Sequence, residues 1–81
     1  MRIHLLCKNE VKNQIVFELF DLETPNRELI VINDNEDPIK AFKNGLLADT
    51  LFMMAADERN TTREEVYRII DSIKNTKIRW F

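Results

Sequence analysis

The chain of 81 residues contains 44% hydrophobic and 32% charged residues and has a formal net charge of −2. This balance is too apolar for a disordered chain, and the length suits one domain near the lower limit for an independent hydrophobic core. The slightly acidic charge excludes a nucleic-acid-binding function that depends on an overall positive field, so any such function needs a local basic patch.

Cysteine usage and hydropathy predict a cytoplasmic protein with no membrane partner. Cys7 is the single cysteine, so it has no partner for a disulfide within the chain, whereas small secreted domains usually need such bonds. The first apolar run, in MRIHLLCKNE, is too short for a signal peptide and alternates as a strand does. No apolar stretch approaches the ~18 residues of a membrane span. We therefore expect one compact cytoplasmic domain over residues 1–81.

Three segments, 2–8, 14–22 and 28–33, have the composition and alternation of β-strands. The links between them are short, and Pro25-Asn26 suits the centre of a turn. Short links favour antiparallel neighbours, so the sequence predicts a three-stranded β-meander.

The faces of these strands differ in their pattern. In the first strand, strict alternation places Ile3, Leu5 and Cys7 on one face, with His4 and Leu6 on the other. The second strand sets Ile15, Phe17 and Leu19 against Val16, Glu18 and Phe20, and the third sets Leu29 and Val31 against Ile30 and Ile32. Because the second and third strands are apolar on both faces, we expect each face to contact something.

A long helix is predicted from Asp37 as N-cap and Pro38 at the first helical position. This helix either continues to about residue 60 or breaks at Asn44-Gly45, because glycine is a common helix terminator. Within it, the segment GLLADTLFMMAADE (45–58) has only four polar or charged residues. Two interpretations stay open: the helix is packed between the sheet and a second helix, or part of its surface contacts a partner.

A second helix is predicted to begin at Thr61 or Thr62, because Thr62 and Glu65 have the spacing of a capping box. Its apolar stripe has helical spacing and consists of Val66, Ile69, Ile70 and Ile73. We expect it to end at Asn75. The complete prediction is an α+β domain of order βββαα, with residues 77–81 as a possible short C-terminal strand.

The sequence predicts no catalytic, metal or cofactor site, and hence no enzyme. His4 and Cys7 are too few for a zinc site, and their separation of three puts them on opposite faces of a regular strand. We interpret Cys7 as a small core residue. The acidic cluster Asp34, Glu36 and Asp37 lacks the ligand spacing of a calcium loop, so helix capping and solvation account for it.

These observations favour a non-enzymatic protein–protein interaction module that binds and modulates a larger cytoplasmic protein, as inhibitors from phages and mobile elements do. Phe52, Met53 and Met54 are the predicted contacts on the long helix, either with a partner or in a homodimer. Trp80 either packs on the sheet beside Ile78 or anchors a partner.

The alternative is a small nucleic-acid-binding regulator that uses the second helix and the C-terminal tail. The short link at residues 59–63 faintly resembles a helix-turn-helix connection. The candidate phosphate-binding residues are Arg59, Arg63, Arg68, Lys74, Lys77 and Arg79. Acidic residues in the same segment nearly cancel this charge, which makes nucleic acid the less favoured partner.

Overall fold

A computed structural model describes residues 1–21 and 27–77 of the chain. Its elements follow the order β1 (Arg2–Asn9), β2 (Gln14–Phe20), β3 (Arg27–Asn33), α1 (Pro38–Ala56) and α2 (Arg63–Asn75). The predicted α+β arrangement βββαα is therefore confirmed. The turn expected at Pro25-Asn26 and the terminal strand expected around Trp80 lie outside the described residues.

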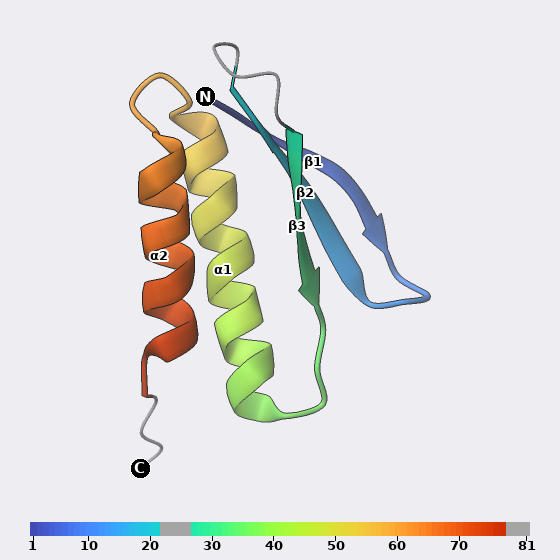
Figure 1. The fold of residues 1–81 in the computed structure, drawn as a ribbon. Coiled ribbons are helices and arrows are strands. Elements are labelled where there is room, and N and C mark those ends of the chain that lie inside the picture. Colours follow the sequence, from blue (N-terminus) through green and yellow to red (C-terminus); the bar gives the residue numbers. More distant parts are fainter. Residues whose placement is uncertain (22–26, 78–81) are drawn as a thin grey trace.

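The three strands form an antiparallel meander in the order β1-β2-β3. Figure 1 shows both helices on the same side of the sheet, where α1 and α2 run beside each other in opposite directions. The β1–β2 turn contains Asn13 with a φ of 49°, a left-handed conformation that asparagine adopts more readily than most residues. Asn9 Oδ1 accepts hydrogen bonds from the backbone N–H groups of Val11 and Lys12, which fixes this turn locally.

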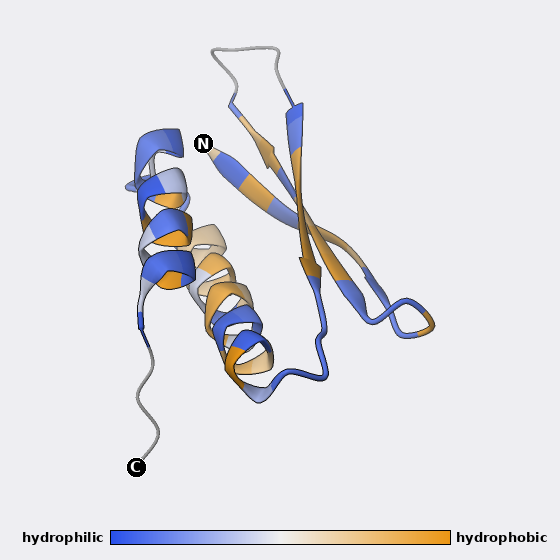
Figure 2. Cartoon of the chain, turned by 60° about the horizontal axis from the view of Figure 1, so that its bottom comes forward, coloured by the Kyte–Doolittle hydropathy of each residue, from blue (hydrophilic) through white to orange (hydrophobic). Residues whose placement is uncertain are grey.

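The hydrophobic core lies between the sheet and the helix layer. Its largest fully buried side chains come from both layers: Phe17, Leu19, Leu51 and Val66. On β2 and β3 the alternation works as predicted, because Phe17, Leu19 and Ile32 are buried while Leu29 and Val31 are exposed. In Figure 2, α2 is hydrophilic with an apolar stripe, whereas much of α1 is apolar.

The predicted faces of β1 are wrong beyond Leu5. A β-bulge shifts the register between Leu5 and Cys7, so Leu5 lies opposite Phe17 but Cys7 lies opposite Val16. The inserted residue, Leu6, moves every later side chain to the other face. Cys7 is consequently exposed rather than a core residue. The same shift places Cys7 on the face of His4, contrary to the predicted separation.

Helix α1 begins and continues for local reasons. Asp37 is the N-cap, and its Oδ1 accepts from the N–H groups of Ile39 (2.9 Å) and Lys40 (3.4 Å). The helix runs through Gly45 without a break, so the alternative of a break at Asn44-Gly45 is wrong. Asn44 donates from its side-chain amide to the carbonyl of Asn33, which ties this part of α1 to the end of β3.

We predict that Gly45→Ala raises the free energy of unfolding by about 0.5–1 kcal/mol. Glycine in a helix interior costs about that much relative to alanine, because it loses more backbone freedom on folding. A Cβ added at Gly45 meets nothing within 4 Å, so no clash offsets the gain. Urea unfolding followed by circular dichroism measures the change. A lower midpoint would mean that the α1 backbone is distorted at this position.

Helix α2 begins as the capping pattern predicts. Thr62 is the N-cap, and its hydroxyl accepts from the Glu65 N–H at 3.3 Å. The helix ends at Asn75, as expected. Val66 and Ile70 on its apolar stripe are buried in the core, and Arg63 in its first turn forms an ion pair of 3.0 Å with Glu28 of β3. This ion pair and the apolar stripe fix α2 relative to the sheet.

Candidate interaction surfaces

The outward face of the sheet is the first candidate site. We call it the open face, because no helix of the described chain covers it (Figure 1). The register brings its members together from all three strands: His4, Cys7, Val16, Glu18, Phe20, Arg27, Leu29 and Val31. The bulge residue Leu6, which has no partner in the β1–β2 register, is also exposed. This surface is apolar at its centre.

Burial on the open face increases from the edge to the middle strand. Leu29 and Val31 on β3 are 62% and 48% exposed, whereas Val16 and Phe20 on β2 are half-buried. A side chain on a middle strand is flanked on both sides by its cross-strand neighbours, so it is partly shielded even without a covering layer. The apolar area accessible to a partner is therefore concentrated on β3.

One end of the open face carries an ordered cluster of polar and aromatic groups. The rings of His4 and Phe20 meet edge to face with centroids 5.0 Å apart. The Arg27 guanidinium lies 5.6 Å from the centroid of the Phe20 ring, and its Nε is 3.5 Å from Oε1 of Glu18. Arg27 and Glu18 form an ion pair, so these two residues together add no net charge to the surface.

The predicted contacts on α1 divide among different environments. Met53 is 74% exposed, whereas Met54 packs against the core. Phe52 is intermediate: almost half of it is exposed, and its ring also contacts the buried Phe17 edge to face at 5.2 Å. Trp80 lies outside the described residues. The 45–58 segment is thus packed in part and exposed in part, and contact of its exposed part with a partner stays a prediction.

A second exposed apolar surface runs along α1. We call it the α1 row; its members are Ile39, Phe42, Leu46 and Met53. Their separations of three, four and seven residues place them on one side of the helix. The exposed Asp49 lies on the same side, between Leu46 and Met53 in the sequence. The α1 row is therefore interrupted by a charge near its middle.

The basic residues of the nucleic-acid hypothesis do not form an equivalent surface. Arg63 is only 19% exposed in its side chain because it pairs with Glu28. The others that the structure describes are exposed along the connection and α2: Arg59, Arg68, Lys74 and Lys77. Arg79 lies outside the described residues. The two helices run beside each other, whereas the helices of a DNA-binding helix-turn-helix cross at about 90–120° (Figure 1). The nucleic-acid hypothesis stays a prediction.

The residues considered for metal binding or chemistry also occupy defined places. His4 and Cys7 share the open face, but among residues 1–21 and 27–77 no three His, Cys, Asp or Glu side chains gather closely enough to hold a metal ion. Asp37 is engaged as the N-cap of α1.

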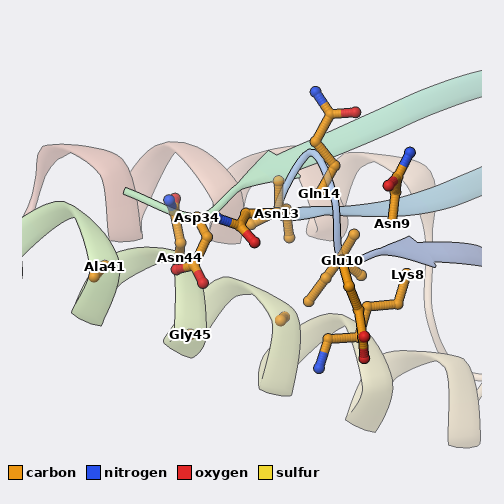
Figure 3. A pocket seen from close by; sticks show the side chains of 12 residues that line it. Lys8, Asn9, Glu10, Asn13, Gln14, Asp34, Ala41, Asn44 and Gly45 are labelled. Atoms are coloured by element: carbon orange, nitrogen blue, oxygen red, sulfur yellow. The ribbon is translucent and has the colours of Figure 1, made fainter. Parts of the chain in front are cut away.

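A cleft of about 470 Å³ lies between the β1–β2 hairpin, the end of β3 and the first half of α1 (Figure 3). Ile15, Ile32 and Ala48 supply apolar lining, and polar side chains such as those of Lys8 and Asp34 line the rest. Several of its polar groups already hold the fold together. The Asp34 N–H donates to the Asn13 carbonyl at 2.6 Å, and the Asn9 and Asn44 side chains bind backbone groups. The cleft is therefore a weaker candidate than the open face.

Comparisons with known proteins add no assignment: no protein-family model, curated protein or solved structure matches this chain. Within the described ranges, neither helix combines the length and apolar character that crossing a membrane requires.

The open face was only partly visible in the sequence. The apolar residues on both faces of the second and third strands indicated a second contact surface, and Leu29 and Val31 are its most exposed strand members. The contribution of Cys7 was missed, because it depends on the bulge in β1.

Proposed function

We propose that this protein is a non-enzymatic binding module that docks on a larger protein through the open face of its sheet. The observation that carries the proposal is the identity of the outward-facing residues. An antiparallel sheet with one solvated face usually alternates apolar residues inward with polar residues outward. Here the outward positions include Val16 and Phe20 on β2 and Leu29 and Val31 on β3.

The chemistry of this face favours an apolar protein surface as its partner. Large exposed apolar patches on soluble proteins usually mark contacts with other molecules. The ionic groups near its end, Glu18 and Arg27, form a pair with each other. A surface that binds nucleic acid through phosphates needs an excess of positive charge, which this pair does not provide. The module would act by occupying a surface of its partner, as small inhibitor proteins do.

We predict that Val16→Lys weakens partner binding at least about 100-fold while the domain stays folded. A charge placed at the centre of an apolar interface is desolvated without a partner, which costs several kcal/mol. In the free protein, the lysine can extend into water from the open face. The measurement is recovery of a partner from native-host extract on immobilised protein, followed by titration with the purified partner.

Val11→Lys is the matched control, because Val11 is a valine that is 95% exposed in the β1–β2 turn, away from the open face. It should bind the partner as the wild type does. The native Cys7 provides an independent measurement, since its exposed thiol lies on the open face. Maleimide labelling of Cys7 should slow when the partner is bound.

Equal partner binding by the wild type and Val16→Lys, with unchanged Cys7 labelling, would refute the proposal. Recovery of DNA or RNA with a steep dependence of affinity on salt would replace it with the nucleic-acid hypothesis. Thermal melting of both variants establishes that any loss of binding occurs in folded protein.

A further inference from the structure

The two edges of the sheet are built differently. Strand β1 is interrupted by the bulge between Leu5 and Cys7. Strand β3 pairs with β2 without any shift of register from Arg27 to Asn33, and the described residues place no strand along its other side. Figure 1 shows β3 at the edge of the sheet opposite β1. One edge is therefore irregular, and the other is regular and available for pairing.

A regular apolar edge strand promotes aggregation of a free protein, because its unpaired N–H and C=O groups can form hydrogen bonds with a strand of another molecule. Bulges and charged residues normally protect such edges, and β1 has both a bulge and Lys8 near its end. Strand β3 reads RELIVIN and has four consecutive apolar residues at its centre, from Leu29 to Ile32. The absence of a bulge or central charge in β3 indicates that this edge is used.

We propose that β3 pairs antiparallel with β3 of a second copy, with the two-fold axis at Ile30, to form one continuous sheet of six strands. This register is self-complementary. It sets Leu29 opposite Val31 of the second copy twice, and Ile30 opposite its own equivalent. Such apolar pairs stabilise neighbouring strands, whereas like charges directly opposite each other destabilise them.

The charged residues at the start of β3 are also compatible with this register. Arg27 falls opposite the neutral Asn33 of the second copy, and Glu28 falls opposite its Ile32, so no like charges meet. Glu28 retains its ion pair with Arg63 within its own chain. The strand can therefore pair with itself without burying an unpaired charge at its centre.

The α1 row is the competing surface for a second copy, and Asp49 disfavours it. Pairing two copies through Leu46 and Met53 would place the Asp49 carboxylate in an apolar interface, where desolvation of the charge opposes association. The central positions of β3 carry no charge. The edge of β3 is therefore the better site for self-association.

Pairing at β3 goes beyond the proposed function and does not depend on it. The most exposed apolar strand residues, Leu29 and Val31, lie on β3. In the six-stranded sheet they move from the margin of one open face to the centre of a face twice as wide.

Sedimentation of the full chain tests the proposal. The wild type should sediment across the micromolar range at twice the chain mass of 9.7 kDa. Val31→Lys should sediment as a folded monomer, because the substitution removes both of the Leu29–Val31 pairs that join the two copies, and edge lysines oppose strand addition. Leu6→Lys is the matched control: Leu6 is also 48% exposed but lies on the β1 edge, so this variant should stay dimeric.

Three results would overturn the proposal: a wild type that is monomeric throughout, a dimer that persists in Val31→Lys, or a dimer that dissociates in Met53→Lys but not in Val31→Lys. The last result would assign self-association to the α1 row. Val16→Lys separates the two proposals, because it should abolish partner binding and leave the dimer intact. Partner binding by Val16→Lys therefore tests the proposed function, and its sedimentation tests the β3 pairing separately.

A cysteine cross-link tests the register. In a Cys7→Ser background, Ile30→Cys should form an intermolecular disulfide under mild oxidation, because residues opposite each other across antiparallel strands have Cα atoms about 4.5–5.5 Å apart. Ile32→Cys in the same background should not cross-link, because its equivalent in the second copy lies four residues away along the ladder. Cross-linking at position 32 and not at position 30 would refute the two-fold axis at Ile30.

Discussion

Replacing Phe17 by alanine is expected to lower the free energy of unfolding by about 3–5 kcal/mol, which leaves little folded protein at 25 °C. Phe17 is completely buried at the middle of the central strand, where its neighbours across the sheet are Leu5 and Ile30. Its ring also contacts Phe52 of α1, so its removal opens a cavity between the two layers. A domain of this size is typically stable by only about 5 kcal/mol. Urea unfolding monitored by circular dichroism measures the loss.

Val16→Ala is the matched control for Phe17→Ala. Val16 is the adjacent residue, but its side chain lies half-buried on the open face. Truncating it should cost about 1 kcal/mol or less, because no second layer of the described chain packs on it. If the two variants lost equal stability, the helices would not be the layer that covers the Phe17 face.

Strand faces were predictable where the backbone is regular. Period-two alternation on β2 correctly placed Phe17 and Leu19 together on one face, which the structure shows to be buried, because each residue along a regular strand reverses the direction of its side chain. The apolar residues on both faces of β2 and β3 also indicated a second contact surface. What alternation could not supply was which of the two faces the helices cover, since both are apolar.

The position of Cys7 could not be predicted for a specific reason. The bulge at Leu6 reverses the alternation of β1, and no glycine or proline in RIHLLCKN marks it. A bulge without such a residue is set by pairing with the neighbouring strand, so it becomes visible only with the register. The same bulge places Cys7 on the open face.

The starts of both helices and the end of α2 were predicted well, whereas α1 ends at Ala56, before the predicted end near residue 60, and the helix surfaces were predicted less well. Capping depends on residues close in sequence, so Asp37 and Thr62 were identified from local spacing alone. The surroundings of Met53 and Met54 depend on where α2 and the sheet lie around α1. Adjacent residues of a helix point about 100° apart, and the tertiary packing decides that Met53 is exposed while Met54 packs on the core.

Replacing Thr61 by valine is expected to lower the free energy of unfolding by about 1–3 kcal/mol, although the two side chains have nearly the same shape. Thr61 is buried, and its hydroxyl donates to the carbonyl of Asp57 at 2.8 Å. The carbonyl oxygen of Met54 is a second acceptor, 3.3 Å from the same hydroxyl. The last carbonyls of a helix lack partners within the helix, and α1 has no basic residue in its last turn. The Thr61 hydroxyl therefore closes the end of α1 just before α2 begins.

Thr61→Ser separates the hydrogen bond from the packing of the methyl group. Serine keeps the donor and loses only the methyl group, which costs about 0.8 kcal/mol for one buried carbon. The valine variant should be the less stable of the two in thermal melting, and hydrogen exchange should accelerate at the Thr62 and Glu65 amides, which lie at the start of α2. Equal stability of the valine variant and the wild type would show that the Asn60 N–H, which also donates to the Asp57 carbonyl at 3.2 Å, satisfies it without the Thr61 hydroxyl. The α1–α2 connection would then be held by apolar packing of Val66 and Ile70 rather than by Thr61.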